Sequence, residues 1–281
     1  MRLYFLMGRR PTPGLSPVMA EVFRRLTGRG FRVESGIAED RLLRTDELAP
    51  QYDLYLLKSY SELALSIAGA LHAAGARLLN PYPNGAVARN KIVARRVLSG
   101  AGVSTPRTWV TGDFRLLRDL VEETPLILKP YLGYSGTGVR VVRNPRELAA
   151  VPPPEGPVLV QEYVEALGED LKVYLVGDDV FAVRKPFSPT SFVVPGRPVP
   201  VPPAVRELAL RCGQVFGLGL YGVDIVESAS GLWVVDVNTF PGYKGVPDAA
   251  PRIADFIADY AMGRRGLPEI AATPGFEAGR S

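Results

Sequence analysis

The sequence predicts an α+β protein, with a small parallel α/β lobe at its N-terminus followed by two lobes built on antiparallel sheets. Three observations predict this architecture. The chain has 281 residues and is 47% apolar, which suffices for a core and, at roughly 150 residues per domain, for about two domains. Strand-like and helix-like segments alternate over residues 1–80, as in a parallel sheet. Beyond residue 108, neighbouring strand-like segments are joined by short turn sequences, as in antiparallel hairpins.

The first 80 residues are expected to form an N-terminal substrate-side domain. Arg2–Met7 is a short apolar run, the pattern of a buried strand. Apolar residues at helical spacing follow from Met19 to Leu26, and glycines at 28 and 30 end that helix. A second helix is expected over Leu63–Ala74. The other strands of this lobe are expected at Phe31–Glu34, Asp53–Leu57 and Arg77–Leu79.

A domain boundary is expected at Asn80–Asn84, where two prolines and two turn-forming residues leave no room for a regular element. Residues 81–263 would form the second domain, with lobes at about 85–165 and about 166–263. It begins with one basic amphipathic helix over residues 85–100, whose apolar side carries Val87, Val93, Val97 and Leu98. Residues 264–281 show no periodicity and predict a flexible tail.

The remaining elements of the second domain are mostly strands. They are expected at Pro125–Lys129, Val139–Val142, Val158–Glu162, Leu171–Val176, Val180–Arg184, Tyr221–Glu227 and Gly231–Val237. Two helices are expected at residues 203–216 and 249–262. The proline-rich segment Pro195–Pro203 is expected to be a surface loop.

Composition excludes several classes of function. The net charge of +4 is mild, so it gives no reason to expect a nucleic-acid partner, and no apolar run is long enough to span a membrane. Cys212 and His72 are the single residues of their types, which excludes Cys/His zinc clusters, and Cys212 is expected in the core. One cysteine and no signal peptide favour a cytoplasmic protein. The sequence carries no signal for an oligomeric state.

A glycine-rich segment after a predicted strand is the first candidate for chemistry. Lys129 ends the strand, and glycines and hydroxyl residues follow at Gly133, Ser135, Gly136, Thr137 and Gly138. Glycines let backbone N–H groups converge on an anion, and the lysine adds a positive charge, so the segment indicates a phosphate site. The alternative is a glycine-rich hairpin with an exposed lysine. The segment is not a Walker A loop, because no Gly-Lys-Ser/Thr follows.

The last predicted hairpin carries three oxygen-bearing side chains. Asp236 and Asn238 are two residues apart on one strand, and so project from the same face. Asp224 lies on the preceding strand and can face them. Two carboxylates and an amide oxygen suit Mg²⁺, which also binds phosphate oxygens. The alternative, solvent-facing polar residues, fits less well because the flanking residues are apolar and buried acids need a cation.

Residues 158–164 are the third candidate. This apolar strand ends in polar residues, so its edge could bind an adenine ring between aliphatic side chains while backbone groups read the base. The residues involved would be Gln161, Glu162, Tyr163 and Val164.

Taken together and in this order, these features resemble the ATP-grasp superfamily, most closely its RimK-like branch, over residues about 80–250. Further matching segments are Asn80, Asn90-Lys91, Ala101–Thr108 and Asp170–Tyr174. The resemblance implies an ATP- and Mg²⁺-dependent enzyme with an ATP cleft between its two antiparallel lobes. It implies that Lys91 and Lys129 hold the phosphates, Glu162 and Val164 the adenine, and Asp170 the ribose. The Mg²⁺ ligands would be Asp224, Asp236 and Asn238.

The resemblance leaves two candidates for the phosphate acceptor. In the usual RimK-branch chemistry, a carboxylate accepts the γ-phosphate and an amine then attacks the acyl phosphate to form an amide. The second candidate is a kinase that phosphorylates a polyol, because Lys58-Ser59-Tyr60 and Asp236–Val246 also resemble the inositol trisphosphate 5/6-kinases. The phosphate loop lacks the His of those kinases, and its match to the RimK branch favours the ligase. The substrates would be small molecules in either case: an acid and an amine, or a polyol phosphate.

Several cations are candidates for contacts with the reacting groups. Lys172, Arg184 and Lys185 lie on one predicted hairpin and could stabilise the transferred phosphoryl group, although solvated strand charges are the alternative. Lys172 stands where RimK-like ligases usually carry Arg, so the charge remains but the bidentate fork is lost. Lys58 and Lys244 are candidates for binding a substrate anion.

Overall fold

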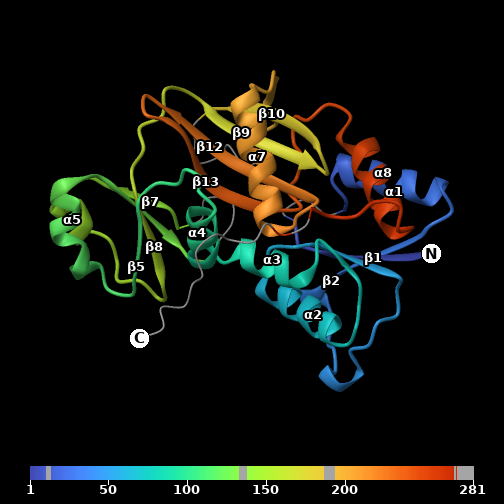
Figure 1. Ribbon diagram of the computed structural model, residues 1–281. Helices are drawn as coiled ribbons and strands as arrows, with labels where there is room; N and C mark the ends of the chain where they lie inside the picture. The colour runs from blue at the N-terminus through green and yellow to red at the C-terminus, as the bar shows by residue number, and fades with distance from the viewer. Residues whose placement is uncertain (11–13, 133–137, 187–193, 269, 271–281) are drawn as a thin grey trace, which may run out of the picture.

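The computed structural model describes the chain except for residues 11–13, 133–137, 187–193, 269 and 271–281. Three sheets form three lobes, and Figure 1 shows them side by side in the order central, C-terminal and N-terminal. The predicted α+β class, with a parallel sheet first and antiparallel sheets after it, is confirmed. Within the described residues, no helix combines the length and apolar character needed to cross a membrane.

The N-terminal lobe is a four-stranded parallel sheet in the order β2-β1-β3-β4. Its strands are β1 (Arg2–Met7), β2 (Arg32–Ile37), β3 (Leu54–Lys58) and β4 (Leu78–Leu79). Alternate residues of β1 pack on opposite faces, Leu3 and Phe5 toward α1 (Pro17–Gly28), Tyr4 and Leu6 toward α2 (Glu62–Ala73). His72 of α2 is exposed.

The central lobe is an antiparallel sheet in the order β5-β8-β6-β7. Its strands are β5 (Thr108–Thr111), β6 (Leu126–Pro130), β7 (Arg140–Val142) and β8 (Val158–Glu162). One face, with Leu126, Leu128 and Val160, packs on the 3₁₀ turn Phe114–Leu117 and on α5 (Arg118–Glu123) and α6 (Pro145–Ala149). The opposite face carries Lys129 and Gln161 and is therefore available to the site. The short strand β5 was not predicted.

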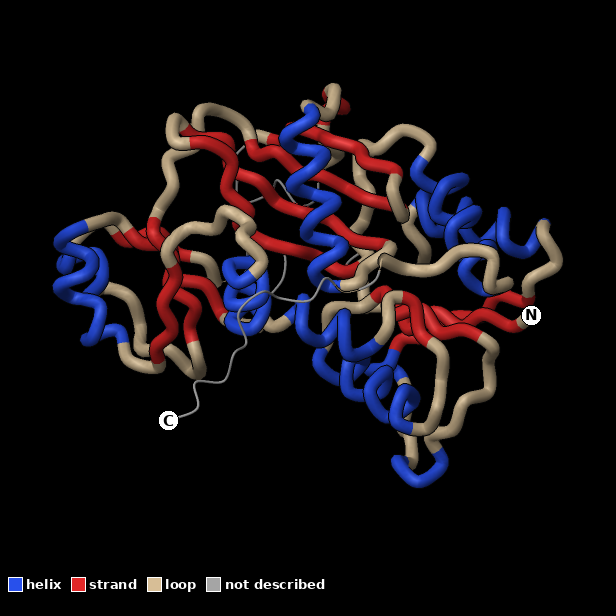
Figure 2. The backbone as a smooth tube through the Cα atoms, viewed as in Figure 1, coloured by secondary structure: helices blue, strands red, loops and turns tan. Residues whose placement is uncertain are grey.

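The C-terminal lobe is a five-stranded antiparallel sheet in the order β11-β10-β9-β12-β13. Its strands are β9 (Asp170–Val176), β10 (Asp179–Lys185), β11 (Arg197–Val199), β12 (Leu220–Ser228) and β13 (Gly231–Thr239). Helix α7 (Pro203–Phe216) crosses one face of this sheet (Figure 2) and buries Cys212 in that core, as predicted. The opposite face holds the polar residues of the candidate site.

Three predictions about the connecting segments are wrong. The boundary Asn80–Asn84 does contain a regular element, because α3 (Tyr82–Arg89) begins there and tolerates Pro83 in its first turn. The single helix expected over 85–100 is two helices, since α4 (Lys91–Gly100) starts afresh at Asn90, and Val93 is 40% exposed. The loop expected at Pro195–Pro203 contains β11, which pairs with the edge of β10.

The tail expected from residue 264 is partly packed. Arg265 forms an ion pair with Asp178 at 2.8 Å, and Leu267 packs against the largest core. Residues 264–268 are therefore not a loose segment, while residues 269 and 271–281 lie outside the described residues.

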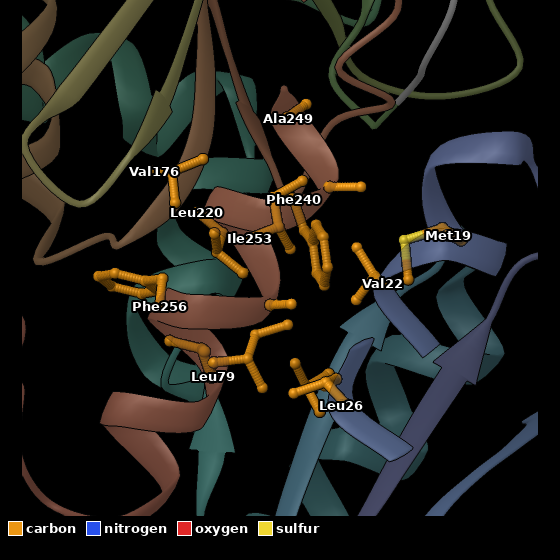
Figure 3. Packing of buried hydrophobic residues seen from close by; sticks show 14 of the residues in the cluster. Met19, Val22, Leu26, Leu79, Val176, Leu220, Phe240, Ala249, Ile253 and Phe256 are labelled. Atoms are coloured by element: carbon orange, nitrogen blue, oxygen red, sulfur yellow. The ribbon is translucent and has the colours of Figure 1, made fainter. Parts of the chain in front are cut away.

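A single hydrophobic core joins the N-terminal and C-terminal lobes. Helix α8 (Ala249–Ala261) packs on α1, and its Ile253 lies in one cluster with Phe240, Val22 and Leu79 (Figure 3). Polar contacts reinforce this junction, because the buried Asn80 side chain accepts from the Gly219 N–H at 2.8 Å. The C-terminal sheet and the carboxyl edge of the parallel sheet are thereby held together.

Candidate active site

The site is built on the open face of the C-terminal sheet, where acidic residues of β12 and β13 lie directly opposite each other. Asp224 is the register partner of Asp236, and Asn238 follows on the same face of β13. The register between the two strands shifts at Asp224/Ile225, a bulge that interrupts the regular pairing beside the acids. The predicted placement of the three oxygen-bearing side chains on one face agrees with this geometry.

Helix α4 delivers Lys91 to Asp236. The Asn90 side chain accepts hydrogen bonds from the N–H groups of Ile92 and Val93, so it caps α4 and fixes where the helix begins. Lys91 is the first residue of the helix, and its Nζ lies 2.7 Å from Oδ2 of Asp236. Its side chain is only 14% exposed, so the pair is well shielded from solvent.

Lys129 approaches the same carboxylate from the central lobe. Its Nζ donates to the Val235 carbonyl oxygen at 3.4 Å, next to Asp236. Burial, together with the positive charges of Arg95 and Lys91, lowers the pKa of Lys129 to about 7. Burial alone would raise the pKa of Asp236, but Lys91, Lys129 and Arg95 outweigh it and the net shift is downward. Asp236 is therefore ionised and surrounded by cations.

A second ion pair holds Asp224. Lys172 of β9 is its register partner, and Lys172 Nζ lies 2.7 Å from Asp224 Oδ2 and 4.0 Å from Asp170 Oδ2. Burial opposes the charge on Lys172, yet Asp224 and Asp170 dominate and raise its pKa. The pKa of Asp170 is itself raised, first by burial. Lys172 thus lies among the acids rather than in solvent.

The donor set fits a divalent cation. Each of the two facing carboxylates already binds an ammonium group at 2.7 Å, which shows that both accept cations on this face. Two carboxylates and the Asn238 amide are hard oxygen donors of the kind that Mg²⁺ prefers. In the described part of the chain no group of three His, Cys, Asp or Glu gathers to bind a metal, so Asn238 and substrate oxygens would complete the set.

Sequence reasoning gave no role in the site to two residues that shape it. Arg95, one turn after Lys91 on α4, is buried and donates to the carbonyl oxygens of Val234 (2.5 Å) and Val235, so it fixes the strand that carries Asp236. Its spacing from Lys91 was the signal, because residues four apart share a helix face. Tyr60 lines the pocket that also includes Lys91 and Asn238, and burial, followed by the charges of Asp236 and Asp224, raises its pKa.

A pocket of about 170 Å³ lies beside Lys91 and Asn238. Arg89 lines it and donates to the carbonyl oxygens of Ser59 (3.1 Å), Tyr60 and Ser61 (3.3 Å), just before α2 begins. The other lining residues are Tyr60, Ser61, Glu62, Leu65, Leu132, Val237 and Thr239. The pocket therefore joins the acid-bearing strand to the N-terminal lobe.

The predicted adenine segment lies at the end of β8. Gln161 is buried, and its side-chain oxygen has no hydrogen-bond partner among the described residues, so it can accept a hydrogen bond from a ligand. The Glu162 N–H donates to the Arg107 carbonyl oxygen and the Tyr163 N–H to that of Pro125. Val164 follows directly after Tyr163, beyond the end of the strand.

The structure describes only one of the predicted residues of the glycine-rich segment, Gly138. Gly133, Ser135, Gly136 and Thr137 lie outside the described residues. Gly138 has φ +74°, and a Cβ there would lie 2.9 Å from Cγ of Pro130, so both its conformation and its space require glycine.

The hairpin cations separate onto two faces. Lys185 is the register partner of Asp170, so it faces the site, and it is buried. Arg184 is the register partner of Leu171, whose face packs on α7, and it forms an ion pair with Glu227 at 2.6 Å. The prediction that Arg184 acts on the transferred group is therefore not supported, because alternation along β10 turns it away from the acids.

Lys58 ends β3 and contacts the loop after β13, which also carries Lys244. Lys58 Nζ donates to the Phe240 carbonyl oxygen at 2.7 Å and lies 5.1 Å from the centre of the Phe240 ring. Burial, then Lys244 and Arg10, lower the pKa of Lys58 to about 8. Lys244 is exposed, four residues after Phe240.

This arrangement of a parallel sheet and two antiparallel lobes around facing acids and lysines is that of the ATP-grasp fold. The chain belongs to the RimK-like ATP-grasp family, because a family model for the RimK-like ATP-grasp domain matches residues 88–260, more than half of the chain. The resemblance predicted from the sequence motifs is thus confirmed.

Individual relatives agree with this assignment. A protein named probable alpha-L-glutamate ligase 2 from Hahella chejuensis is 33% identical over 190 residues, which span 62% of each chain. A RimK domain ATP-grasp protein from Sphaerobacter thermophilus has a TM-score of 0.75 at 20% identity, covering 94% of this chain and 100% of the other. The ligase PsnB, solved with its minimal precursor, Mg and ADP, has a TM-score of 0.63 at 20% identity, covering 92% and 96%.

Proposed function

We propose that the protein is an ADP-forming carboxylate–amine ligase that uses ATP with Mg²⁺ and joins L-glutamate through an amide bond. The observation that carries the proposal is the convergence of Lys91, Lys129, Asp224 and Asp236, with Asn238 beside them, around one face of the C-terminal sheet. The name of the Hahella chejuensis relative supports glutamate as a substrate.

In the proposed reaction a carboxylate oxygen attacks the γ-phosphorus of ATP and ADP leaves. An amine nitrogen then attacks the acyl carbon, phosphate leaves, and the nitrogen loses a proton. Lys91 and Lys129 bind phosphate oxygens, and Lys172 and Lys185 neutralise charge on the transferred group. Asp224, Asp236 and Asn238 would hold Mg²⁺, which neutralises phosphate charge when bound. The unpartnered oxygen of Gln161 supports an adenine site at the end of β8, where the backbone of Glu162 and Val164 would contact the base.

The experiment measures ADP release from MgATP with L-glutamate and a glutamate-terminated peptide, alone and together, and the product mass. The proposal expects ADP release that depends on both an acid and an amine, and a product one glutamyl residue heavier. ADP release with an inositol phosphate alone would instead establish the kinase alternative, which the lysines near β3 make worth testing. Absence of turnover with every substrate, despite nucleotide binding, would mean a non-catalytic ATP-binding module.

A further inference from the structure

Strand β13 departs from the regular alternation of a β-strand where it approaches the site. Val234 and Val237 both pack into the core that α7 covers, whereas Asp236 lies on the opposite, open face of the sheet. Side chains of a regular strand alternate between its two faces, so residue 236 of a regular strand would share the face of Val234. The face on which Asp236 lies therefore depends on a local departure from the strand pattern.

This departure is the bulge between β12 and β13, whose extra residue is Val235. The strand pairing joins Asp236 to Asp224 and Val234 to Ile225, and it passes over Val235. An extra residue in one strand shifts the alternation by one position and re-aims the side chains that follow. The bulge thus turns the second half of β13, with its proposed metal-binding side chains, toward the site.

Arg95 holds the bulge from the outer edge of the sheet, where β13 is the last strand. Its guanidinium donates to the carbonyl oxygens of Val234 at 2.5 Å and of Val235. Successive carbonyls of a regular strand point to opposite edges, so one side chain bonds both only where the backbone departs from that pattern. Arg95 is only 7% exposed, so its donors act on this backbone rather than on solvent.

Arg95 also links the bulge to the two lysines that are proposed to bind phosphate. It lies one turn after Lys91 on α4, so both side chains reach β13 from the same helix face. Lys129 Nζ donates to the same Val235 carbonyl oxygen as Arg95, at 3.4 Å. Because Arg95 also bonds that oxygen, Lys129 can turn toward a phosphate without leaving the carbonyl unpaired.

We propose that Arg95 is a positioning residue for the metal site: its paired hydrogen bonds maintain the bulge at Val235, and the bulge keeps Asp236 and Asn238 facing the nucleotide. Arg95 acts through the backbone of β13 and does not itself contact the metal or the substrates. The inference rests on the proposed function, which supplies the metal and the nucleotide. The gain in nucleotide affinity that Mg²⁺ provides should therefore depend on Arg95 more strongly than the affinity for nucleotide alone.

The test measures ADP binding by calorimetry, with saturating Mg²⁺ and with a chelator instead. The ratio of the two affinities reports on the metal site, and a general loss of stability does not change it while the protein stays folded. Arg95→Met should lower this ratio about tenfold, as the loss of hydrogen bonds from a charged donor allows, with the affinity in chelator nearly unchanged. Arg96→Met is the matched control, because it removes the charge of the next, exposed residue of α4 and should change neither affinity.

Arg95→Lys separates position from charge. Lysine keeps the positive charge but lacks the planar fork that bonds two carbonyls at once, so the Mg²⁺ ratio should fall in this variant too. Arg95→Lys also decides the question if Arg95→Met does not fold. Hydrogen exchange of the ligand-free protein gives a second readout, in which Arg95→Met should speed the exchange of residues 234–238 about tenfold relative to β9 in the same sheet.

An unchanged Mg²⁺ ratio in Arg95→Met, or a full ratio in Arg95→Lys, would overturn the positioning role. Exchange that rises equally in β9 and in residues 234–238 would also overturn it, because the effect would then be general. If the ligase assay gives no amide product while the Mg²⁺ ratio is lost in Arg95→Met as expected, the proposed reaction is overturned and the role of Arg95 stands.

Discussion

Asp236 lies among the positive charges of three residues, so removing its carboxylate is expected to affect both catalysis and stability. In Asp236→Asn, Lys91, Lys129 and Arg95 lose the carboxylate that offsets their repulsion. We expect MgATP-dependent turnover to fall about 1000-fold or more, because several kcal/mol of charge stabilisation depends on the bound metal. The free energy of unfolding should fall by about 3 kcal/mol, since a shielded ion pair is broken from one side.

Steady-state ADP release and denaturant unfolding check these two effects separately. Glu227→Gln serves as the control, because it also neutralises one acid of an ion pair on β12, but on the face away from the site. Turnover near that of the unaltered protein in Asp236→Asn would contradict the role of Asp236 as a metal ligand.

Lys58 makes the stability of the protein depend on pH in an unusual direction. Its folded-state pKa of about 8 lies below the ordinary value of 10.5, so between these values the unfolded chain holds a proton that the folded chain has released. The contribution of Lys58 to the free energy of unfolding therefore rises as pH increases through this window. Thermal unfolding at pH 7 and pH 10 should show the unaltered protein gaining stability relative to Lys58→Met. A constant difference between the two proteins would contradict the depressed pKa.

At the scale of residues, the sequence identifies site residues whose polarity differs from that of their neighbours in the chain. Asp224 and Asp236 were identifiable because they interrupt apolar strands, which buried acids do only with a partner. Arg95 was not, because its partners Val234 and Val235 lie about 140 positions away and contact it only in the folded chain. The prediction for Arg184 was based on its residue type, which suits a phosphoryl group. Strand alternation, however, places its side chain on the opposite face of the sheet.

At the scale of elements, the break between α3 and α4 positions Lys91. Asn90→Ala removes the side chain that accepts from the first N–H groups of α4. We expect a loss of about 1 kcal/mol in the free energy of unfolding, as for other N-caps. The KM for ATP should rise as well, because the start of the helix would no longer be fixed. Asn90→Ser, which retains a capping oxygen, should behave like the unaltered protein in both measurements, and equal defects in the two variants would refute the capping role.

Strongly patterned elements were predicted well, and weakly patterned ones were not. Strand β8 and helix α7 begin and end at the predicted residues, because long apolar runs and helical spacing specify them. One helix was predicted over 85–100, although the structure has two, because the apolar spacing continues through the break at Asn90. Strands β5 (Thr-Trp-Val-Thr) and β11 (Arg-Pro-Val) are short and begin with polar residues, so neither stands out as an apolar run, and they form by pairing with β8 and β10.

At the scale of the whole molecule, two of the three lobes share a hydrophobic core and the third has its own. The N-terminal and C-terminal lobes meet in one cluster that includes Phe5, Val22, Phe240 and Ile253, whereas the central lobe encloses its own. We expect hydrogen exchange to show β1, β3, β9 and β12 opening together and β6 and β8 opening as a separate, less protected unit. Equal protection across all three sheets would contradict this division.

The sequence predicted three lobes but not this division of the cores. The proline-rich segment at Asn80–Asn84 indicated a boundary between the first lobe and the rest. Helix α8 nevertheless returns from the end of the chain to pack on α1, and Arg77 donates to the Ala261 carbonyl oxygen at 2.9 Å. Local patterns carry no information about such a return, because it depends on which apolar faces remain uncovered.

The two ammonium–carboxylate pairs of the site have a consequence for the order of ligand loading. Lys91 and Lys172 act as internal counterions, so the acids are already neutralised before any ligand arrives. A divalent ion that binds alone must break these lysine–carboxylate pairs, so its net binding free energy is small. When ATP binds as well, its phosphates can pair with the displaced ammonium groups. Calorimetry should therefore find weak uptake of Mg²⁺ alone and strong, mutually dependent uptake of Mg²⁺ with ATP. The ligand-free protein would therefore bind Mg²⁺ only when ATP binds with it.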